Sequence, residues 1–174
     1  MSGLDPKVVK RMIDDSDNAP HPQAKGELFE HLLEYVFESV PGTLVKHNSA
    51  SFFGSEQIDL AVANRGGFPG LPDKFLVECK NYSDPIDSKA VGYFLYICVS
   101  RSAELAVIVA SNGLTGDNDD LTHAHSLAMT AQVLKCRLVV LTRADLLGLA
   151  DEQALVDLLE ERHLAAFSTG GIGA

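Results

Sequence analysis

The segment Phe75-Leu76-Val77-Glu78-Cys79-Lys80 begins as an apolar run and ends on an acid and a base. Side chains alternate between the two faces of a β-strand, so Glu78 and Lys80 share one face while Val77 and Cys79 occupy the other. An apolar strand that ends on two charged groups gives up some stability to place them there. The pattern therefore indicates a chemical role at the end of this strand.

The preceding strand-like segment, residues 56–63, supplies a second acid. Its apolar side chains alternate along the segment, and Asp59 is the lone acid between them. The intervening residues 64–73 are rich in Gly and Pro, which indicates a loop. If the two strands pair as a hairpin across this loop, Asp59 lies next to Glu78.

Helical and strand patterns alternate through the rest of the chain. The last helix has a possible break near Gly148. The expected order is helix 25–40, strands 43–47, 56–63 and 75–80, helix 88–101, strand 105–110, helix 120–135, strand 138–141 and helix 143–162. This order (αβββαβαβα) predicts a three-layer α/β protein with a mixed central sheet flanked by helices.

Length and composition indicate one globular domain. The chain has 174 residues, of which 46% are apolar and 22% charged. We expect residues 1–23 to form an N-terminal arm, 24–165 the domain itself, and 166–174 a flexible Gly-rich tail.

No segment approaches the roughly 20 apolar residues needed to cross a membrane, and the N-terminus lacks a signal-peptide pattern, so we expect a cytoplasmic location. The three cysteines match no zinc-site spacing and are interpreted as core residues.

The net charge of −10 restricts the partners of the protein. The chain contains 14 Lys and Arg residues but 24 Asp and Glu residues. Affinity for nucleic acid comes largely from basic side chains that neutralise phosphates. This balance argues against tight, autonomous binding to nucleic acid, but it allows a locally basic groove. Residues 88–101 are apolar nearly all round, which favours a buried helix or a contact with a second subunit. We therefore expect a homodimer, or a subunit of a larger complex that supplies basic surface.

Converging carboxylates are suited to a hard divalent cation. Asp59 and Glu78 would offer oxygen ligands to Mg²⁺ or Mn²⁺, and the backbone carbonyl of Cys79 is a plausible third ligand. An ammonium at Lys80 can orient or help to deprotonate a water bound to the metal, and can counter charge that develops on a phosphate. Glu27, near the start of the first helix, is a further acid that could reach the ion directly or through water.

The pattern Glu27 … Asp59 … Glu78-Cys79-Lys80 resembles the PD-(D/E)xK nuclease superfamily, close to the Mrr-like restriction endonucleases and the Holliday-junction resolvases. The resemblance covers roughly residues 24–145 and implies a restriction-endonuclease-like fold. It also implies Mg²⁺-dependent cleavage of DNA, less so of RNA, in restriction, repair or defence. Asp59 and Glu78 would be the metal ligands, Lys80 the catalytic lysine and Glu27 the accessory helix acid. The chain departs from the family pattern at Ile58, where the family has a proline without a chemical role.

Simpler interpretations exist for each of these residues. An acid-x-Lys at a strand end, taken alone, is more often a solvated salt bridge, and the same fold can also serve as a non-catalytic or partner-dependent interaction module. A histidine pair at 123 and 125 points in two directions on a helix, so we expect surface or capping roles there. Weaker candidates for substrate contact, each also an ordinary loop, cap or strand-end residue, are Asn81, Lys89, Ser111 and Lys46.

Overall fold

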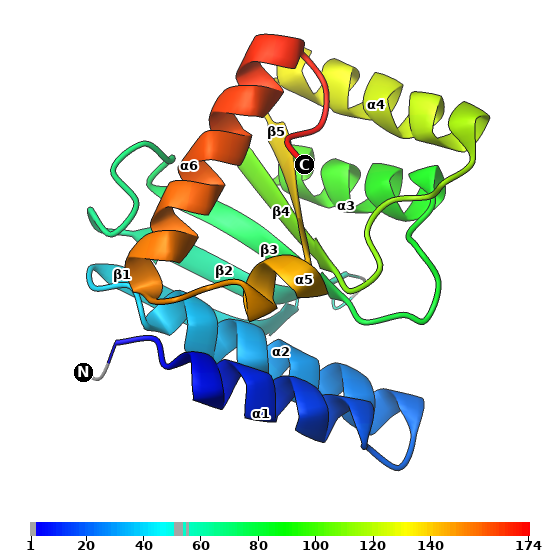
Figure 1. The fold of residues 1–174 in the computed structure, drawn as a ribbon. Coiled ribbons are helices and arrows are strands. Elements are labelled where there is room, and N and C mark those ends of the chain that lie inside the picture. The colour runs from blue at the N-terminus through cyan, green and yellow to red at the C-terminus, as the bar shows by residue number, and fades with distance from the viewer. Residues whose placement is uncertain (1–2, 51–53, 55) are drawn as a thin grey trace.

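The computed structural model describes residues 3–50, 54 and 56–174, and shows one mixed β-sheet between helices (Figure 1). The elements in chain order are α1 (Pro6–Asp17), α2 (Pro22–Glu38), β1 (Thr43–Ala50), β2 (Gln57–Asn64), β3 (Lys74–Lys80), α3 (Ser88–Ser100), β4 (Leu105–Ala110), α4 (Asn118–Val133), β5 (Arg137–Thr142), α5 (Arg143–Leu147) and α6 (Glu152–Thr169). This order confirms the α/β architecture expected from the sequence. The last expected helix is divided into α5 and α6 near Gly148, where α5 ends.

The strands follow their chain order across the sheet, β1-β2-β3-β4-β5. The first three strands are antiparallel, whereas β3, β4 and β5 run parallel to one another. Every residue of β4 is buried, as expected for an apolar strand that is covered on both faces. The sheet therefore presents the ends of β3 and β4 at the same edge, where Lys80 pairs with Ala110.

Two hydrophobic cores lie on opposite faces of the sheet. One joins α2 and α6 to the sheet through large side chains such as Phe29, Phe37 and Leu159. The other joins α3 and α4 to the opposite face through Phe94 and Ala128 among others (Figure 1). Burial of this apolar area on both faces is the main favourable contribution to folding, and it fixes the ends of the strands on which the charged residues lie.

The β2–β3 hairpin forms as predicted, and the side chain of Asn64 organises its loop. The amide nitrogen of Asn64 donates to the carbonyl oxygens of Phe68, Leu71 and Pro72, and its Oδ1 accepts from the backbone N–H groups of Gly66 and Phe68. Asn64 is buried, so these contacts satisfy polar groups that water does not reach. The loop brings β3 back beside β2, which is what allows Asp59 and Glu78 to approach each other.

Asn64→Ala is expected to destabilise the protein by about 2–3 kcal/mol, because it leaves several buried backbone groups without a partner. Chemical denaturation, monitored by circular dichroism, would measure the change in the free energy of unfolding. Asn118→Ala is the matched control, since Asn118 is exposed and its change should stay within about 0.5 kcal/mol. Equal stability of the two variants would contradict the role of Asn64.

The N-terminal residues differ from the expected arm. Residues 6–17 form helix α1, whose buried side chains Val9 and Ile13 join the core formed with α2. Asp5 accepts a hydrogen bond from the backbone N–H of Lys7, and proline follows at the first helical position, a common way to begin a helix. The helix therefore packs on α2, side by side with it (Figure 1).

The C-terminal residues also differ from the expected flexible tail. Helix α6 continues to Thr169, and Gly170 then adopts a left-handed conformation that ends the helix. Gly173 next forms two backbone hydrogen bonds with β5, at Leu138 and Val140, and Ile172 is buried. This segment therefore packs against the sheet. The domain limits 24–165 stay a prediction.

Helix α3 is amphipathic in its packing, although its sequence is apolar nearly all round. Val91, Phe94 and Ile97 are buried in the core, whereas Tyr93 and Tyr96 are more than half exposed. These two tyrosines are therefore the side chains of α3 that could form the expected contact with a second subunit. Among the residues that the structure describes, no helix is both long and apolar enough to cross a membrane.

Candidate active site

The carboxylate of Asp59 meets β3 where the β2–β3 ladder ends. The paired residues Leu60 and Val77 are the last of this ladder, and one residue further on Asp59 lies opposite Glu78. There the Oδ2 of Asp59 accepts a hydrogen bond of 2.7 Å from the backbone N–H of Cys79. The Asp59 side chain thus accepts a hydrogen bond that a neighbouring strand would otherwise accept from the Cys79 N–H. The two acids converge, as the hairpin pattern predicted.

Lys80 completes the group. Its Nζ lies 2.5 Å from Oε1 of Glu78, and 5.7 Å from the centre of the Tyr82 ring. Burial by itself lowers the pKa of Lys80, but the Glu78 carboxylate raises it by charge and hydrogen bonding, and the net direction is upward. Lys80 therefore carries a positive charge at neutral pH. The alternation of side chains along β3 places this charge beside the Glu78 carboxylate.

The three charged groups line one cavity of about 280 Å³ at the edge of the sheet. Helix α2 forms one wall of it through its first turns, and the ends of β2 and β3 form the other. The lining residues are Pro22, Lys25, Gly26, Glu30, Asp59, Glu78, Cys79, Lys80, Asn81 and Tyr82. A small, half-open cavity that contains two acids and a lysine is suited to one ion and one phosphate group.

Burial raises the pKa values of both carboxyl groups above their ordinary range. Burial, followed by the charge of Asp59, raises the pKa of Glu78 to about 7. Burial also raises the pKa of Asp59, and the nearby charge of Glu30 adds to this, whereas the Cys79 N–H acts in the opposite direction. Two carboxylates that resist ionisation without a counter-charge fit a site for a divalent cation. Their donor atoms are all oxygen, the ligand type that Mg²⁺ and Mn²⁺ prefer.

Comparison with known proteins agrees with this geometry. The Mrr_cat family model, described as a restriction endonuclease, matches residues 23–159. The chain belongs to the Mrr_cat restriction endonuclease family. The family is one of the PD-(D/E)xK nucleases, so the resemblance seen in the sequence is confirmed, as is the restriction-endonuclease-like fold. A search of curated proteins gave no match.

The acid of α2 that lines the cavity in this Mrr_cat domain is Glu30, whereas the predicted accessory acid, Glu27, lies outside it. The Glu27 side chain is exposed, accepts a hydrogen bond of 3.0 Å from Gln23, and does not line the cavity. Glu30 lines it instead, one turn further along α2. Glu30 lies at the edge of the apolar stripe of α2, on the same side of the helix as the buried residues Leu33 and Phe37. This position directs its side chain toward the sheet. This periodicity was a signal available in the sequence.

Two of the weaker candidates, Asn81 and Ser111, hold the site together. The Ser111 hydroxyl donates to Oδ1 of Asn81 (2.5 Å), and the Asn81 amide donates to the hydroxyl of Ser16 (2.9 Å). Ser16 in turn donates to the carbonyl oxygen of Lys25 (2.8 Å). This chain of bonds joins the ends of β3 and β4 to α1 and α2. Asn81 lines the cavity, but its amide is engaged in these contacts.

The other two weaker candidates lie away from the acids. Lys89 is exposed on the first turn of α3 and does not line the cavity. Lys46 is exposed on β1 and lines a different, larger groove of about 760 Å³, together with Lys74 and Arg101. The smaller cavity is the candidate active site, because Asp59, Glu78 and Lys80 lie there and not in the larger groove.

Proposed function

We propose that this Mrr_cat protein is a Mg²⁺- or Mn²⁺-dependent endonuclease that hydrolyses phosphodiester bonds in DNA, in restriction, repair or defence. One observation carries the proposal: Asp59, Glu78 and Lys80 converge in one cavity of a restriction endonuclease fold. A role in restriction, repair or defence is consistent with the expected cytoplasmic location.

Asp59 and Glu78 are the proposed metal ligands, with the Cys79 backbone carbonyl as a possible third. When bound, a divalent ion would supply a Lewis acid for the phosphoryl oxygen and lower the pKa of a coordinated water. The residues of the chain do the positioning. The Cys79 N–H fixes the Asp59 carboxylate, and the strand alternation fixes Glu78 beside Lys80.

Lys80 is proposed to act as a cation. Its raised pKa favours the protonated form, so in the free protein it is set to offset negative charge on a phosphate and to hold a proton near the site of attack. Its Nζ is confined by Glu78 and by the ring of Tyr82, which limits the positions it can adopt. Electrostatic stabilisation by a fixed cation needs little reorganisation during the reaction.

Glu30→Gln is expected to weaken metal affinity and cleavage by about 10- to 100-fold, the usual range for outer partners of a metal site. Glu30 lines the cavity and its charge acts on Asp59. Glu27→Gln is the matched control on the same helix, and it should cleave DNA at the rate of the native protein because Glu27 is exposed outside the cavity. Cleavage rates of both variants over a range of Mn²⁺ concentrations would show which of the two acids supports the metal site. A larger loss for Glu27→Gln would restore the sequence-based assignment.

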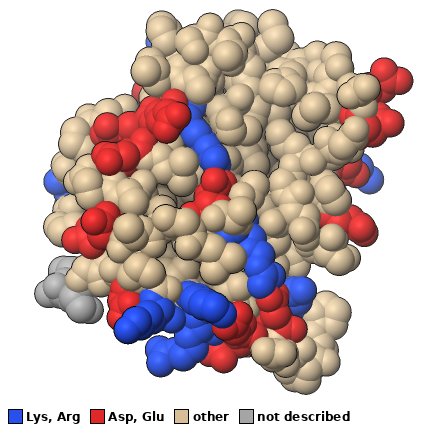
Figure 2. Space-filling view, viewed as in Figure 1, with Lys and Arg blue, Asp and Glu red and all other residues tan. Residues whose placement is uncertain are grey.

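The charge distribution bears on how the DNA is held. Basic side chains gather over α1 in the lower part of the view, but acidic side chains lie among them (Figure 2). Lys7, Lys10 and Arg11 on α1 are exposed, and Lys10 pairs with Asp14. This interleaving and the net charge of −10 support dependence on a basic partner or a second subunit.

The exposed tyrosines of α3 are the proposed contact for a second copy of the chain. Tyr93 and Tyr96 are more than half exposed, and aromatic side chains are enriched in protein interfaces. Light scattering on the purified protein would give its mass in solution. A dimer that dissociates in a Tyr93→Ser, Tyr96→Ser double variant is the expected result, and a native protein that is monomeric at all concentrations would contradict the homodimer.

The substrate class is tested by incubating the protein with supercoiled, linear, branched and single-stranded DNA and with RNA, in Mg²⁺, Mn²⁺ or EDTA. Cleavage of one or more DNA substrates in metal, and of none in EDTA, is expected. Preference for branched DNA would indicate a repair role, and preference for linear duplex a role in restriction or defence. Cleavage of RNA alone would contradict the proposed substrate. The absence of any cleavage would favour the alternative, a partner-dependent interaction module of the same fold.

A further inference from the structure

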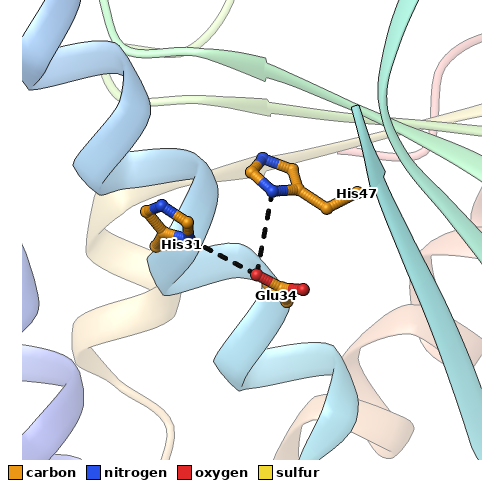
Figure 3. A group of neighbouring side chains, drawn as sticks. All are labelled: His31, Glu34 and His47. Carbon is orange, nitrogen blue, oxygen red and sulfur yellow. Dashed lines mark hydrogen bonds and ion pairs between the residues drawn. The ribbon is translucent and has the colours of Figure 1, made fainter. Parts of the chain in front are cut away.

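A second group of potential metal ligands lies beside the active site, on the other side of Glu30. His31 and Glu34 project from neighbouring turns of α2, and His47 of β1 points toward them (Figure 3). One ligand atom from each residue lies within 4.8 Å of the other two. The group combines two imidazoles with one carboxylate, so it differs in chemistry from the all-oxygen site formed by Asp59 and Glu78.

The distances in this group fit a tetrahedral ion. Oε2 of Glu34 lies 3.4 Å from Nδ1 of His31 and 3.8 Å from Nδ1 of His47. Ligands bound at about 2.0–2.2 Å to a tetrahedral zinc ion lie roughly 3.3–3.6 Å from one another. The distance from His31 to Glu34 lies within this range and that from His47 to Glu34 slightly exceeds it. The ligand atoms of the two imidazoles lie within 4.8 Å of each other and would close on the ion when it binds. The exposed side of His31 leaves a fourth position open to solvent.

Glu30 supplies the outer partner that such sites commonly have. Its Oε2 lies 2.9 Å from Nε2 of His47, the ring nitrogen that faces away from Glu34. A histidine that binds a metal through one nitrogen usually donates from the other to a carboxylate, which fixes its tautomer and orientation. With Nε2 donating to Glu30, the lone pair of Nδ1 faces the Glu34 carboxylate. Two acceptors directed at each other are stabilised by a cation between them.

We propose that His31, Glu34 and His47 bind one divalent transition-metal ion of the zinc class, separate from the Mg²⁺ or Mn²⁺ site. Imidazole ligands favour Zn²⁺ and Co²⁺ over Mg²⁺, which prefers oxygen. The ion would join α2 to β1, an edge strand of the sheet, and would hold Glu30 in place through His47. This proposal does not depend on nuclease activity.

Cobalt absorption tests the site without an activity assay. Co²⁺ is titrated into the metal-free protein with millimolar Mg²⁺ present to occupy the oxygen site. We expect one equivalent of Co²⁺ to give the intense visible bands of tetrahedral coordination, and Zn²⁺ to displace it. His31→Ala and His47→Ala should each weaken binding at least tenfold, since loss of an outer partner alone costs about 10- to 100-fold.

Matched controls separate this site from other binding. His123→Ala removes an exposed histidine on α4, and Glu38→Gln removes an exposed acid on α2, so both should bind Co²⁺ like the native protein. Asp59→Asn should also keep the cobalt bands, because it alters only the oxygen site. Zn²⁺ should raise the melting temperature of the native protein and leave that of His47→Ala unchanged.

Three results would overturn the proposal: no tetrahedral cobalt spectrum, binding that survives both histidine substitutions, or bands that disappear in Asp59→Asn.

Discussion

Asp59→Asn is expected to reduce metal-dependent DNA cleavage by about 10³-fold or more. The substitution keeps the size of the side chain and its ability to accept the hydrogen bond from Cys79, but it removes one of the two charges that attract a divalent cation. Metal catalysis of this type is worth several kcal/mol, and each ~1.4 kcal/mol corresponds to a factor of ten in rate. The loss should appear in the rate at saturating Mn²⁺, and in calorimetric titrations as weaker binding of Mn²⁺.

The Asp59→Asn protein should remain folded. Burial raises the pKa of both carboxyl groups, and the charge of Asp59 further raises the pKa of Glu78, so removal of the Asp59 charge leaves the metal-free protein at least as stable. The melting temperature without metal is the measurement. Asp73→Asn, in the exposed hairpin loop, is the control and should leave both activity and stability unchanged. Full activity in Asp59→Asn would remove this residue from the site.

Lys80→Met is expected to lower the cleavage rate by about 10²- to 10⁴-fold while affecting metal affinity much less. Methionine retains most of the apolar stem but removes the ammonium that offsets charge on the phosphate. The effect should therefore fall on the rate at saturating metal. Single-turnover kinetics over a series of Mn²⁺ concentrations would separate the rate from the affinity.

Lys74→Met is the control for the lysine, because Lys74 lies on the same strand and is exposed at its other end. It should cleave DNA normally. If Lys80→Met lost Mn²⁺ binding and kept its rate at saturation, the lysine would serve only to position Glu78, with which it is paired.

The core of the site was predictable because it depends on local alternation. A strand of period two places Glu78 and Lys80 on one face, and the Gly- and Pro-rich loop 64–73 brings Asp59 opposite them. Thr142 and Asp145 likewise form a capping box within a single turn at the start of α5. Patterns within one or two neighbouring strands or a single turn need no knowledge of distant contacts.

The sequence did not show which acid of α2 lines the cavity, because this depends on tertiary packing. Glu27 and Glu30 both belong to α2, and only the rotation of this helix against the sheet decides which carboxylate enters the cavity. The apolar stripe of the helix contained part of this information, because Glu30 borders the stripe. The contact of His47 with Glu30 connects residues 17 positions apart and could not be found from spacing alone.

The two ends of the chain were missed for a different reason. The polar run after Ile13 and the glycines after Thr169 both have compositions typical of unstructured termini. Each end nevertheless buries a few apolar side chains against distant elements. Val9 and Ile13 of α1 pack against α2, and Ile172 is buried beside β5. Such contacts depend on surfaces that exist only after the domain has folded.

The decisive measurement is nicking of supercoiled plasmid DNA by the native protein and by Lys80→Met, each in Mn²⁺ and in EDTA. We expect the native protein to cleave in Mn²⁺ but not in EDTA, and Lys80→Met to cleave at least about 100-fold less. Equal cleavage by the two proteins, or cleavage that persists in EDTA, would contradict a metal-dependent active site formed by Asp59, Glu78 and Lys80.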